Sequence, residues 1–373
     1  MPERPVITLS LSTLLTLLLT GLALILLWQL RWLLVVLMVA VVIAATLAPA
    51  VNTAERWGLP RWLAVIGVYF ALLSLLVGFG VIIGPTVAEQ IQRLLRKLPA
   101  YLEVLANVLE NLSIRWGLTE PDTWAYLESL FNLQSLTTWG LRTSRDLLVR
   151  SYSLTRGLVG GVLSTLLAII LSGYMLTGSE SLIRGLVQLF PTPWDSQLAA
   201  QVRPVSQRMG GYIQGRILVS AILGVAISLG LNFLGLSEFA LGLGVIAGFT
   251  NLIPFFGPVL GSIPALIVAI AQGGWLFLWV LLLFVIIQNI ETYVLDPLLV
   301  GNTVQVPPIL QLLAVLGGAQ VLGIIGALIV PPWVAGSLVV LDNLYIQPKL
   351  KAQDSQNLPP VDDSPHPSLP LSS

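Results

Sequence analysis

The chain has 373 residues, of which 56% are hydrophobic and 10% charged, and its mean hydropathy is +0.89. This composition excludes a soluble globular protein and predicts an all-α protein embedded in a lipid bilayer. Basic and acidic residues number 18 each, which excludes the basic surface that nucleic-acid binding needs. Cysteine is absent and the one histidine, His366, lies in the polar C-terminal tail, so we expect no metal site, no cofactor and no thiol chemistry.

Charge-free runs mark the candidate membrane spans, because a spanning helix needs about 20 mostly apolar residues and charges there are unfavourable. The first run resembles a secretory signal, but Arg31 and a second span follow it at once, which favours a retained first helix. The run 239–290 is long enough for two crossings joined near Gln272-Gly273-Gly274, so we expect about eight membrane-embedded helical elements. The runs cover residues 5–30, 32–54, 62–88, 157–179, 217–237, 239–290 and 297–341.

One sizeable region, residues 85–156, interrupts the series of spans. Its first part places Val87, Ile91, Leu94 and Leu98 on one helical face, which predicts an amphipathic helical insert. The insert either packs as a cap on the bundle or at the membrane interface, or it forms a ligand-binding or gating domain. Three tryptophans fit the first alternative as interfacial anchors: Trp116, Trp124 and Trp139.

The predicted organisation therefore has six parts. A polar, proline-rich composition predicts that the tail after Lys351 is disordered. The parts are residues 1–84 with the first three spans, the insert 85–156, a fourth span at 157–179, an amphipathic cytoplasmic linker at 180–209, a transport core at 210–345 and a disordered tail at 346–373.

Basic residues in the short loops indicate the orientation of the spans. If the N-terminus is inside, the inner loops hold nine basic residues and the short outer loops hold only Arg31. We therefore expect both termini in the cytoplasm. The nine residues are Arg4, Arg56, Arg61, Arg184, Arg203, Arg208, Arg216, Lys349 and Lys351.

Two apolar segments, 248–267 and 317–336, contain glycines and prolines that interrupt a helix at membrane depth. A broken backbone is tolerated there only where protein buries it or where it lines a wet cavity. Secondary transporters place substrate between two such discontinuous elements. We assign the breaks to function and expect most of the glycines, for example Gly242, Gly244 and Gly248, to serve helix packing. The predicted break residues are Pro254 and Pro258 in the first segment and Pro331 and Pro332 in the second.

A polar stripe lies between these two segments. Gln288, Thr292 and Asp296 share one face of a helix, and Glu291 lies beside it. Desolvation of Glu291 near the end of a span would permit proton exchange, whereas a span that ends earlier would leave Glu291 and Asp296 as wet interface residues. Two amides have no comfortable position in lipid, so we expect them to face protein or a polar path: Asn251 and Asn289.

Residues 210–336 resemble the autoinducer-2 exporter (AI-2E) family of bacterial permeases. The resemblance is carried by N-L-I-P-x-x-G-P at Asn251 to Pro258 and by Q-N-I-E at Gln288 to Glu291. The chain departs from the usual pattern at Val306-Pro307-Pro308, where a histidine often precedes the proline, and at Pro331-Pro332-Trp333, where one proline is usual.

The resemblance implies eight membrane-embedded helical elements, a homo-oligomer that is a pentamer, and a place in the bacterial inner membrane. It implies export of a small polar solute, with autoinducer-2 the named case. Other members are assigned sodium/proton or lithium/proton antiport, so the resemblance leaves a monovalent cation and a proton open as partners. From the broken segment and the polar stripe we place on the substrate or ion pathway Asn251, Pro254, Gly257, Pro258, Gln288, Asn289, Glu291 and Asp296.

Missing motifs narrow the mechanism further. The chain has no G-x-x-x-x-G-K-[S/T] phosphate loop, so transport would be gradient-driven, passive or dependent on a partner. It also has no G-x-S-x-G or H-E-x-x-H motif, and we therefore expect that it is not an enzyme. The remaining alternative is a non-transporting membrane scaffold, which would need no polar stripe beside two broken helices.

Overall fold

The computed structural model describes residues 11–115, 151–301 and 306–357, and every regular element in these ranges is helical. This confirms the predicted all-α class. In chain order the elements are α1 (Leu11–Gln29), α2 (Arg31–Arg56), α3 (Arg61–Arg115), α6 (Ser151–Thr177), α7 (Ser179–Val187), α8 (Trp194–Phe233), α9 (Ala240–Thr250), α10 (Phe256–Gln272), α11 (Leu276–Ile290), the π-helix η1 (Glu291–Gly301), α12 (Pro308–Leu341), the π-helix η2 (Asp342–Ile346) and α13 (Gln347–Asn357).

Five helices in the described residues are long and apolar enough to cross a membrane, and six if α6 and α7, which meet at a bend of 86°, form one broken span. The expected count of about eight is therefore not confirmed. Helix α9 is too short to count as a span. Its 11 residues rise only about 16 Å, which is half of a hydrocarbon layer of about 30 Å. The spans begin in α2, α3, α8, α11 and α12.

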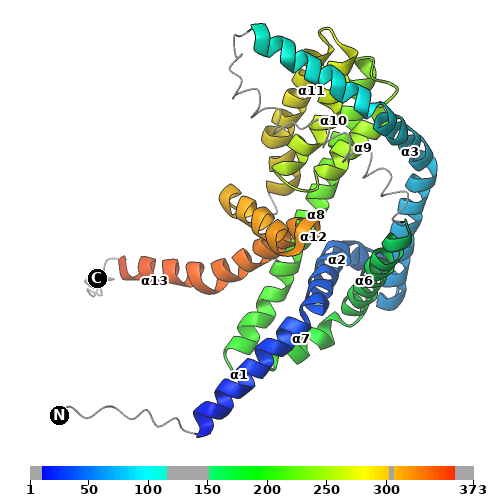
Figure 1. Ribbon diagram of the computed structural model, residues 1–373. Helices are drawn as coiled ribbons and strands as arrows, with labels where there is room; N and C mark the ends of the chain where they lie inside the picture. The colour runs from blue at the N-terminus through cyan, green and yellow to red at the C-terminus, as the bar shows by residue number, and fades with distance from the viewer. Residues whose placement is uncertain (1–10, 116–150, 302–305, 358–373) are drawn as a thin grey trace, which may run out of the picture.

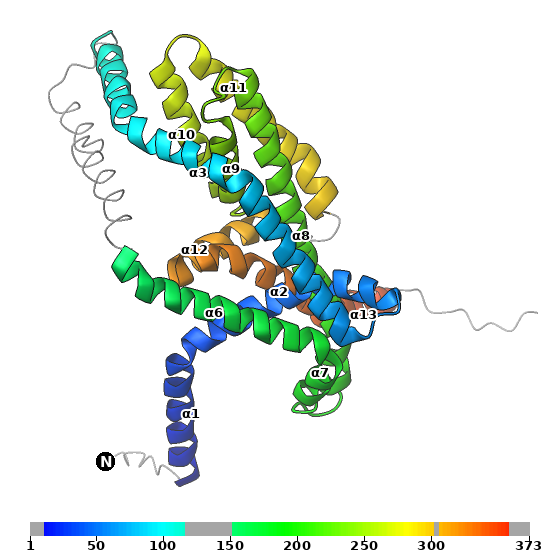
Figure 2. The same cartoon turned by 90° about the vertical axis from the view of Figure 1, so that its right-hand side faces the viewer.

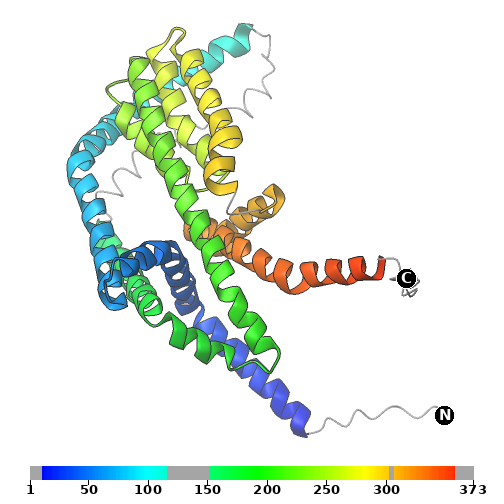
Figure 3. The same cartoon turned by 180° about the vertical axis from the view of Figure 1, so that it is seen from behind.

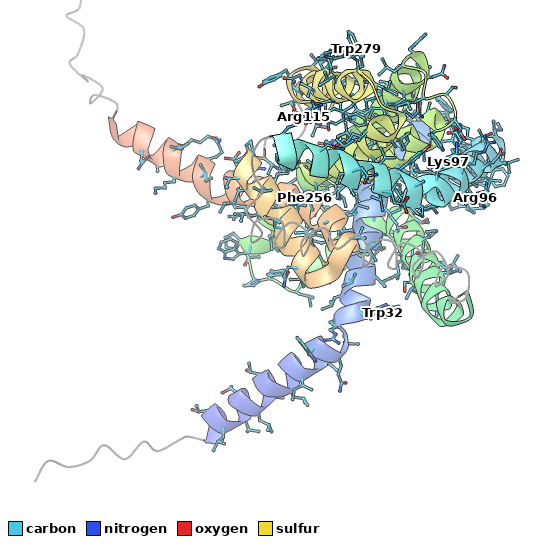
Figure 4. All side chains as sticks on the ribbon, turned by 45° about the horizontal axis from the view of Figure 1, so that its top comes forward. Trp32, Arg96, Lys97, Arg115, Phe256 and Trp279 are labelled. Atoms are coloured by element: carbon cyan, nitrogen blue, oxygen red, sulfur yellow. The ribbon has the colours of Figure 1, made fainter. Side chains whose placement is uncertain are left out.

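Helix α8 organises the molecule. Its 40 residues extend about 60 Å, so it passes from α7 at one end, past α2 near its middle, to the group α9, α10 and α11 at the other (Figure 3). Large apolar side chains remain exposed over the outer surfaces, as a bilayer requires. Trp32 on α2 and Trp279 on α11 illustrate this, with 51% and 56% of their surfaces exposed (Figure 4).

Helix α3 runs without interruption from the third span into the insert, so the predicted boundary at residues 84 and 85 lies inside one helix. Pro85 and Pro99 both lie within it. Its second half crosses over the group of α8, α9 and α10 (Figures 1 and 2), where Leu94 is buried in the main apolar core. The described part of the insert therefore packs on the bundle. The three tryptophans that we expect as anchors lie outside the described residues.

Polar contacts fix α3 to the start of α9. The backbone N–H of Gly242 donates to Gln90 Oε1 at 2.7 Å, and Lys97 Nζ donates to Glu238 Oε1 at 2.7 Å. The Lys97 ammonium also lies 5.3 Å from the ring centroid of Phe239. Helix α9 is short and can bury little apolar surface, so these contacts with α3 help to hold it in place.

Helix α12 bends at Gly323, and this corrects the predicted break at Pro331 and Pro332. Both prolines are buried inside the helix, whereas Gly323 has φ 65° and ψ −149°, a conformation that essentially only glycine adopts. A Cβ on Gly318 would collide with the carbonyl of Gly326, although eight residues of straight helix would separate the two by about 12 Å. The two halves of α12 therefore fold back on each other, and a glycine conformation sets the bend rather than a missing proline N–H.

The C-terminal tail is also more ordered than predicted. Residues 347–357 form α13, which projects away from the bundle (Figure 1), so residues 352–357 are helical rather than disordered. The helix continues from α12 through η2 and so needs no new nucleation, and lysine, alanine and glutamine are good helix formers. Residues 358–373 lie outside the described part.

Glycines let α8 and α9 approach closely, as predicted for Gly244 and Gly248. A Cβ on Gly244 would lie 2.6 Å from the carbonyl oxygen of Gly224, and one on Gly248 would lie 2.9 Å from that of Ser220. Gly78 on α3 has no atom within 4 Å of its Cβ position.

Replacing Gly244 with alanine should therefore lower stability by about 1–3 kcal/mol, because the methyl group overpacks the helix contact. The matched change Gly78→Ala should leave stability unchanged or slightly higher, because alanine favours a helix. Thermal unfolding of the purified variants in detergent checks this. Equal loss in both variants would contradict the packing role of Gly244.

Candidate functional site

A buried ion pair joins α8 to the end of α11. Arg216 Nη1 donates to Glu291 Oε1 at 3.0 Å, and the two side chains are only 5% and 3% exposed. Asn251 completes the cluster, because its Nδ2 donates to the same Glu291 oxygen at 3.0 Å and its Oδ1 accepts from Arg216 Nη2 at 3.4 Å. Three polar side chains from three segments thus hydrogen-bond to one another in the interior of the protein.

The break between α9 and α10 positions Asn251. Helix α9 ends at Thr250, and Phe255 has φ 66° and ψ −45°, while the N–H of Phe256 donates to the carbonyl of Pro254 at 2.8 Å. This is a γ-turn with positive φ, which costs of order 1–3 kcal/mol for a residue with a side chain. Gly257 allows α10 to press against the end of α9, because a Cβ there would collide with the Thr250 carbonyl.

The π-helix η1 places a second carboxylate beside the arginine. Asp296 Oδ1 lies 3.5 Å from Arg216 Nη1, on the same cation that binds Glu291. Residues five apart are about 140° apart around an α-helix, but i to i+5 hydrogen bonding in a π-helix brings them onto one face. Pro297, which has no N–H to donate, lies inside this helix.

The cluster forms part of the wall of a cavity of about 450 Å³ between α8, α10, α11, η1 and the start of α12. Apolar side chains make up most of the lining, and the charged groups are Arg216, Glu291 and Asp296. The remaining lining residues are Pro254, Phe255, Pro258, Val259, Ser262, Leu266, Leu281, Phe284, Val285, Gln288, Thr292 and Gln311.

Most of the residues predicted for the pathway lie at this site. Pro254, Pro258, Gln288, Glu291 and Asp296 line the cavity. Asn251 is hydrogen-bonded to Glu291, and Gly257 lies in the first turn of α10, directly after the break.

Two expectations differ from the structure. Asn289 is exposed, and its Nδ2 donates to the carbonyl of Val285 at 2.7 Å. Its amide therefore hydrogen-bonds within its own helix, on the outer face of α11, and does not face the cluster. Pro331 and Pro332 are buried within α12 and do not line the cavity.

Arg216 is the residue that the sequence analysis missed. It was counted among the inner-loop charges because it borders an apolar run, but the structure buries it. The sequence does contain an indication of this role. A glutamate at membrane depth needs a partner of opposite charge, and Arg216 is the basic residue directly before the apolar run 217–237.

Polar atoms of the site remain without a hydrogen bond. Among the described residues, Arg216 Nε, Ser220 Oγ and Asp296 Oδ1 are buried and have no hydrogen-bond partner within the protein. No three of the described His, Cys, Asp and Glu side chains come together as a metal site. Two of these three atoms, Arg216 Nε and Asp296 Oδ1, belong to residues that line the cavity.

The sequence was compared with known families and proteins. Residues 14–346 match the family described as "AI-2E family transporter". The chain belongs to this family. Its members are membrane transport proteins, and the long apolar helices of the chain make it a multi-pass membrane protein.

Bacterial relatives share about a quarter of the sequence. The protein named "Putative transport protein YueF" of Bacillus subtilis is 26% identical over 285 residues, which cover 76% of each chain. YrrI of the same organism, which bears the same description, is 27% identical over 288 residues, 74% of this chain and 76% of YrrI. A third, sll0060 of Synechocystis, is 26% identical over 287 residues, 74% of this chain and 76% of its own length.

Replacing Arg216 with methionine should destabilise the protein by about 3–5 kcal/mol, because it leaves Glu291 buried without its counter-charge. The double variant Arg216→Met with Glu291→Met should recover much of this loss, since both charges are then removed. Thermal unfolding of the single and double variants measures the coupling. Lys97→Met, which breaks the exposed pair with Glu238, is the control and should cost less. Additive losses at Arg216 and Glu291 would contradict the ion pair.

Proposed function

We propose that this chain is a permease that moves a small polar solute through the cavity between the broken helices. The observation that supports this most strongly is the buried cluster of Arg216, Asn251 and Glu291 at the cavity wall. Ionisable groups inside a membrane are unfavourable, and they persist where they serve a substrate or ion path. A scaffold without transport would be more stable with apolar residues at these positions.

The chemistry of the cavity favours a small solute with hydroxyl groups. A volume of about 450 Å³ lies within the range of small-molecule sites, and its walls are mostly apolar with a few polar groups. The Gln288 amide and the hydroxyls of Ser262 and Thr292 line the cavity and supply groups that can hydrogen-bond to such a solute. Autoinducer-2 is the first candidate solute, since it is the case for which the family is named.

Sodium/proton or lithium/proton antiport is the second candidate function. The observation that favours it is the excess of carboxylates, because two acidic side chains face one arginine in the same cavity wall. A gradient of one of these cations would then drive transport, in agreement with the missing phosphate loop.

We further propose that the protein lies in the bacterial inner membrane with both termini in the cytoplasm and acts as a homo-oligomer, a pentamer by family resemblance. The bias of basic residues toward the inner loops supports the orientation. Removal of the buried Arg216 from that count leaves eight residues inside against Arg31 outside, so the bias holds.

Flux into proteoliposomes tests the proposal. The purified chain is reconstituted, and uptake of labelled autoinducer-2, of small polyols and of ²²Na⁺ is followed with and without a pH gradient. Val259→Trp should lower flux strongly, because Val259 lines the cavity and a larger side chain there reduces the space for a solute. Val81→Trp, at a side chain on α3 that is 69% exposed, is the control and should transport normally. Absence of flux for every solute tried would favour the scaffold.

A further inference from the structure

The two carboxylates of the site are held differently. Glu291 Oε1 accepts two hydrogen bonds at 3.0 Å, one from Arg216 and one from Asn251, and the side chain is 3% exposed. The Asp296 side chain is 41% exposed, its Oδ1 lies 3.5 Å from Arg216 without a hydrogen bond, and no described residue donates to that oxygen. Glu291 is therefore fixed as the partner of Arg216, whereas Asp296 is only loosely held.

The charges around the cavity do not balance. The charged side chains that line it are one arginine and two carboxylates, which leaves one negative charge when both acids are ionised. From α8, the Tyr212 hydroxyl also lies near this group, but it accepts a hydrogen bond from Gln311 Nε2 at 3.1 Å. The other lining residues from α10, α11 and α12 are neutral. An uncompensated charge among apolar walls is unfavourable, so the site is stabilised when one monovalent cation or one proton binds.

Neutral oxygen-bearing side chains line the same cavity as the loosely held acid. Gln288 Nε2 donates to Thr292 Oγ1 at 3.4 Å, which turns the amide nitrogen toward the hydroxyl and leaves the Gln288 carbonyl oxygen as an acceptor. Both residues line the same wall as Asp296. Hard cations prefer carboxylate, carbonyl and hydroxyl oxygens. The unpaired Arg216 Nε is itself buried, and the net negative charge of the lining disfavours an anion.

We propose that Asp296 is the site at which a proton and a sodium or lithium ion exchange, and that Arg216 is a fixed internal counter-charge for Glu291. This rests on the proposed transport function and assigns its coupling site. In the exchange, the O–H bond of the Asp296 carboxyl breaks, the proton leaves to water, and the carboxylate pairs with the entering cation. It places the exchanging role on Asp296 and not on Glu291, for which the sequence leaves proton exchange open.

Infrared difference spectroscopy tests the assignment on the purified full chain. Sodium chloride replaces choline chloride at constant ionic strength, at a series of pH values from acid to neutral. We expect sodium to remove one protonated-carboxyl C=O band, and lithium to do the same. Labelling of all aspartates with ¹³C at the carboxyl group should shift this band, and the same labelling of glutamates should leave it in place. Asp296→Asn should abolish it, whereas Asp195→Asn, a change at the start of α8 outside the cavity, should retain it.

A band that shifts only with labelled glutamate would return the exchanging role to Glu291 and overturn the inference. A spectrum that neither sodium nor lithium alters at any pH would also overturn it. The assay needs no solute transport, so its failure is separate from failure of the proposed function. In that case solute flux in liposomes would persist without a coupling cation at Asp296.

Discussion

The ion pair between Arg216 and Glu291 is the interaction on which the rest of the transport half depends. A charged side chain at membrane depth is tolerated only with a partner, and here the partners come from helices 75 residues apart in sequence. Asn251 adds the hydrogen bonds that the pair still needs, so the end of α9 must reach the same point. One electrostatic requirement thus determines where three segments meet.

Several unfavourable local structures follow from this requirement. The chain leaves helical geometry between α9 and α10 with a strained φ at Phe255, and it adopts a π-helix after Glu291. Close glycine contacts between α8 and α9, and between the halves of α12, compensate by bringing backbones together. Strained backbone and π-helices often occur at functional sites, and here both line one cavity beside a charged cluster. These features would weaken a simple helix bundle. Here they form the space that a solute can occupy.

The sequence predicted the membrane character, the break at Pro254 and a polar face around Gln288, Glu291 and Asp296, because these depend on local composition and spacing. It did not predict the burial of Arg216, because the local sequence around a basic residue at the edge of an apolar run does not distinguish a solvated side chain from a buried one. It placed the second break at a proline pair, although α12 bends at Gly323, because the fold-back depends on contact between Gly318 and Gly326. The helical α13 and the continuity of α3 past Pro85 also depend on neighbouring elements that local patterns do not contain.

Transport through the cavity requires that water reaches it beside the buried ion pair. Because the chain has no cysteine, single introduced cysteines can measure this access directly. Single cysteines at Ser262, which lines the cavity, and at Ile82, which is 77% exposed on the apolar surface of α3, would be treated in intact membranes with a charged, membrane-impermeant methanethiosulfonate reagent. The account predicts rapid modification of the cysteine at position 262 and none at position 82, because only the cavity offers the water that ionises a thiol. Equal resistance at both positions would contradict a polar path through this part of the protein.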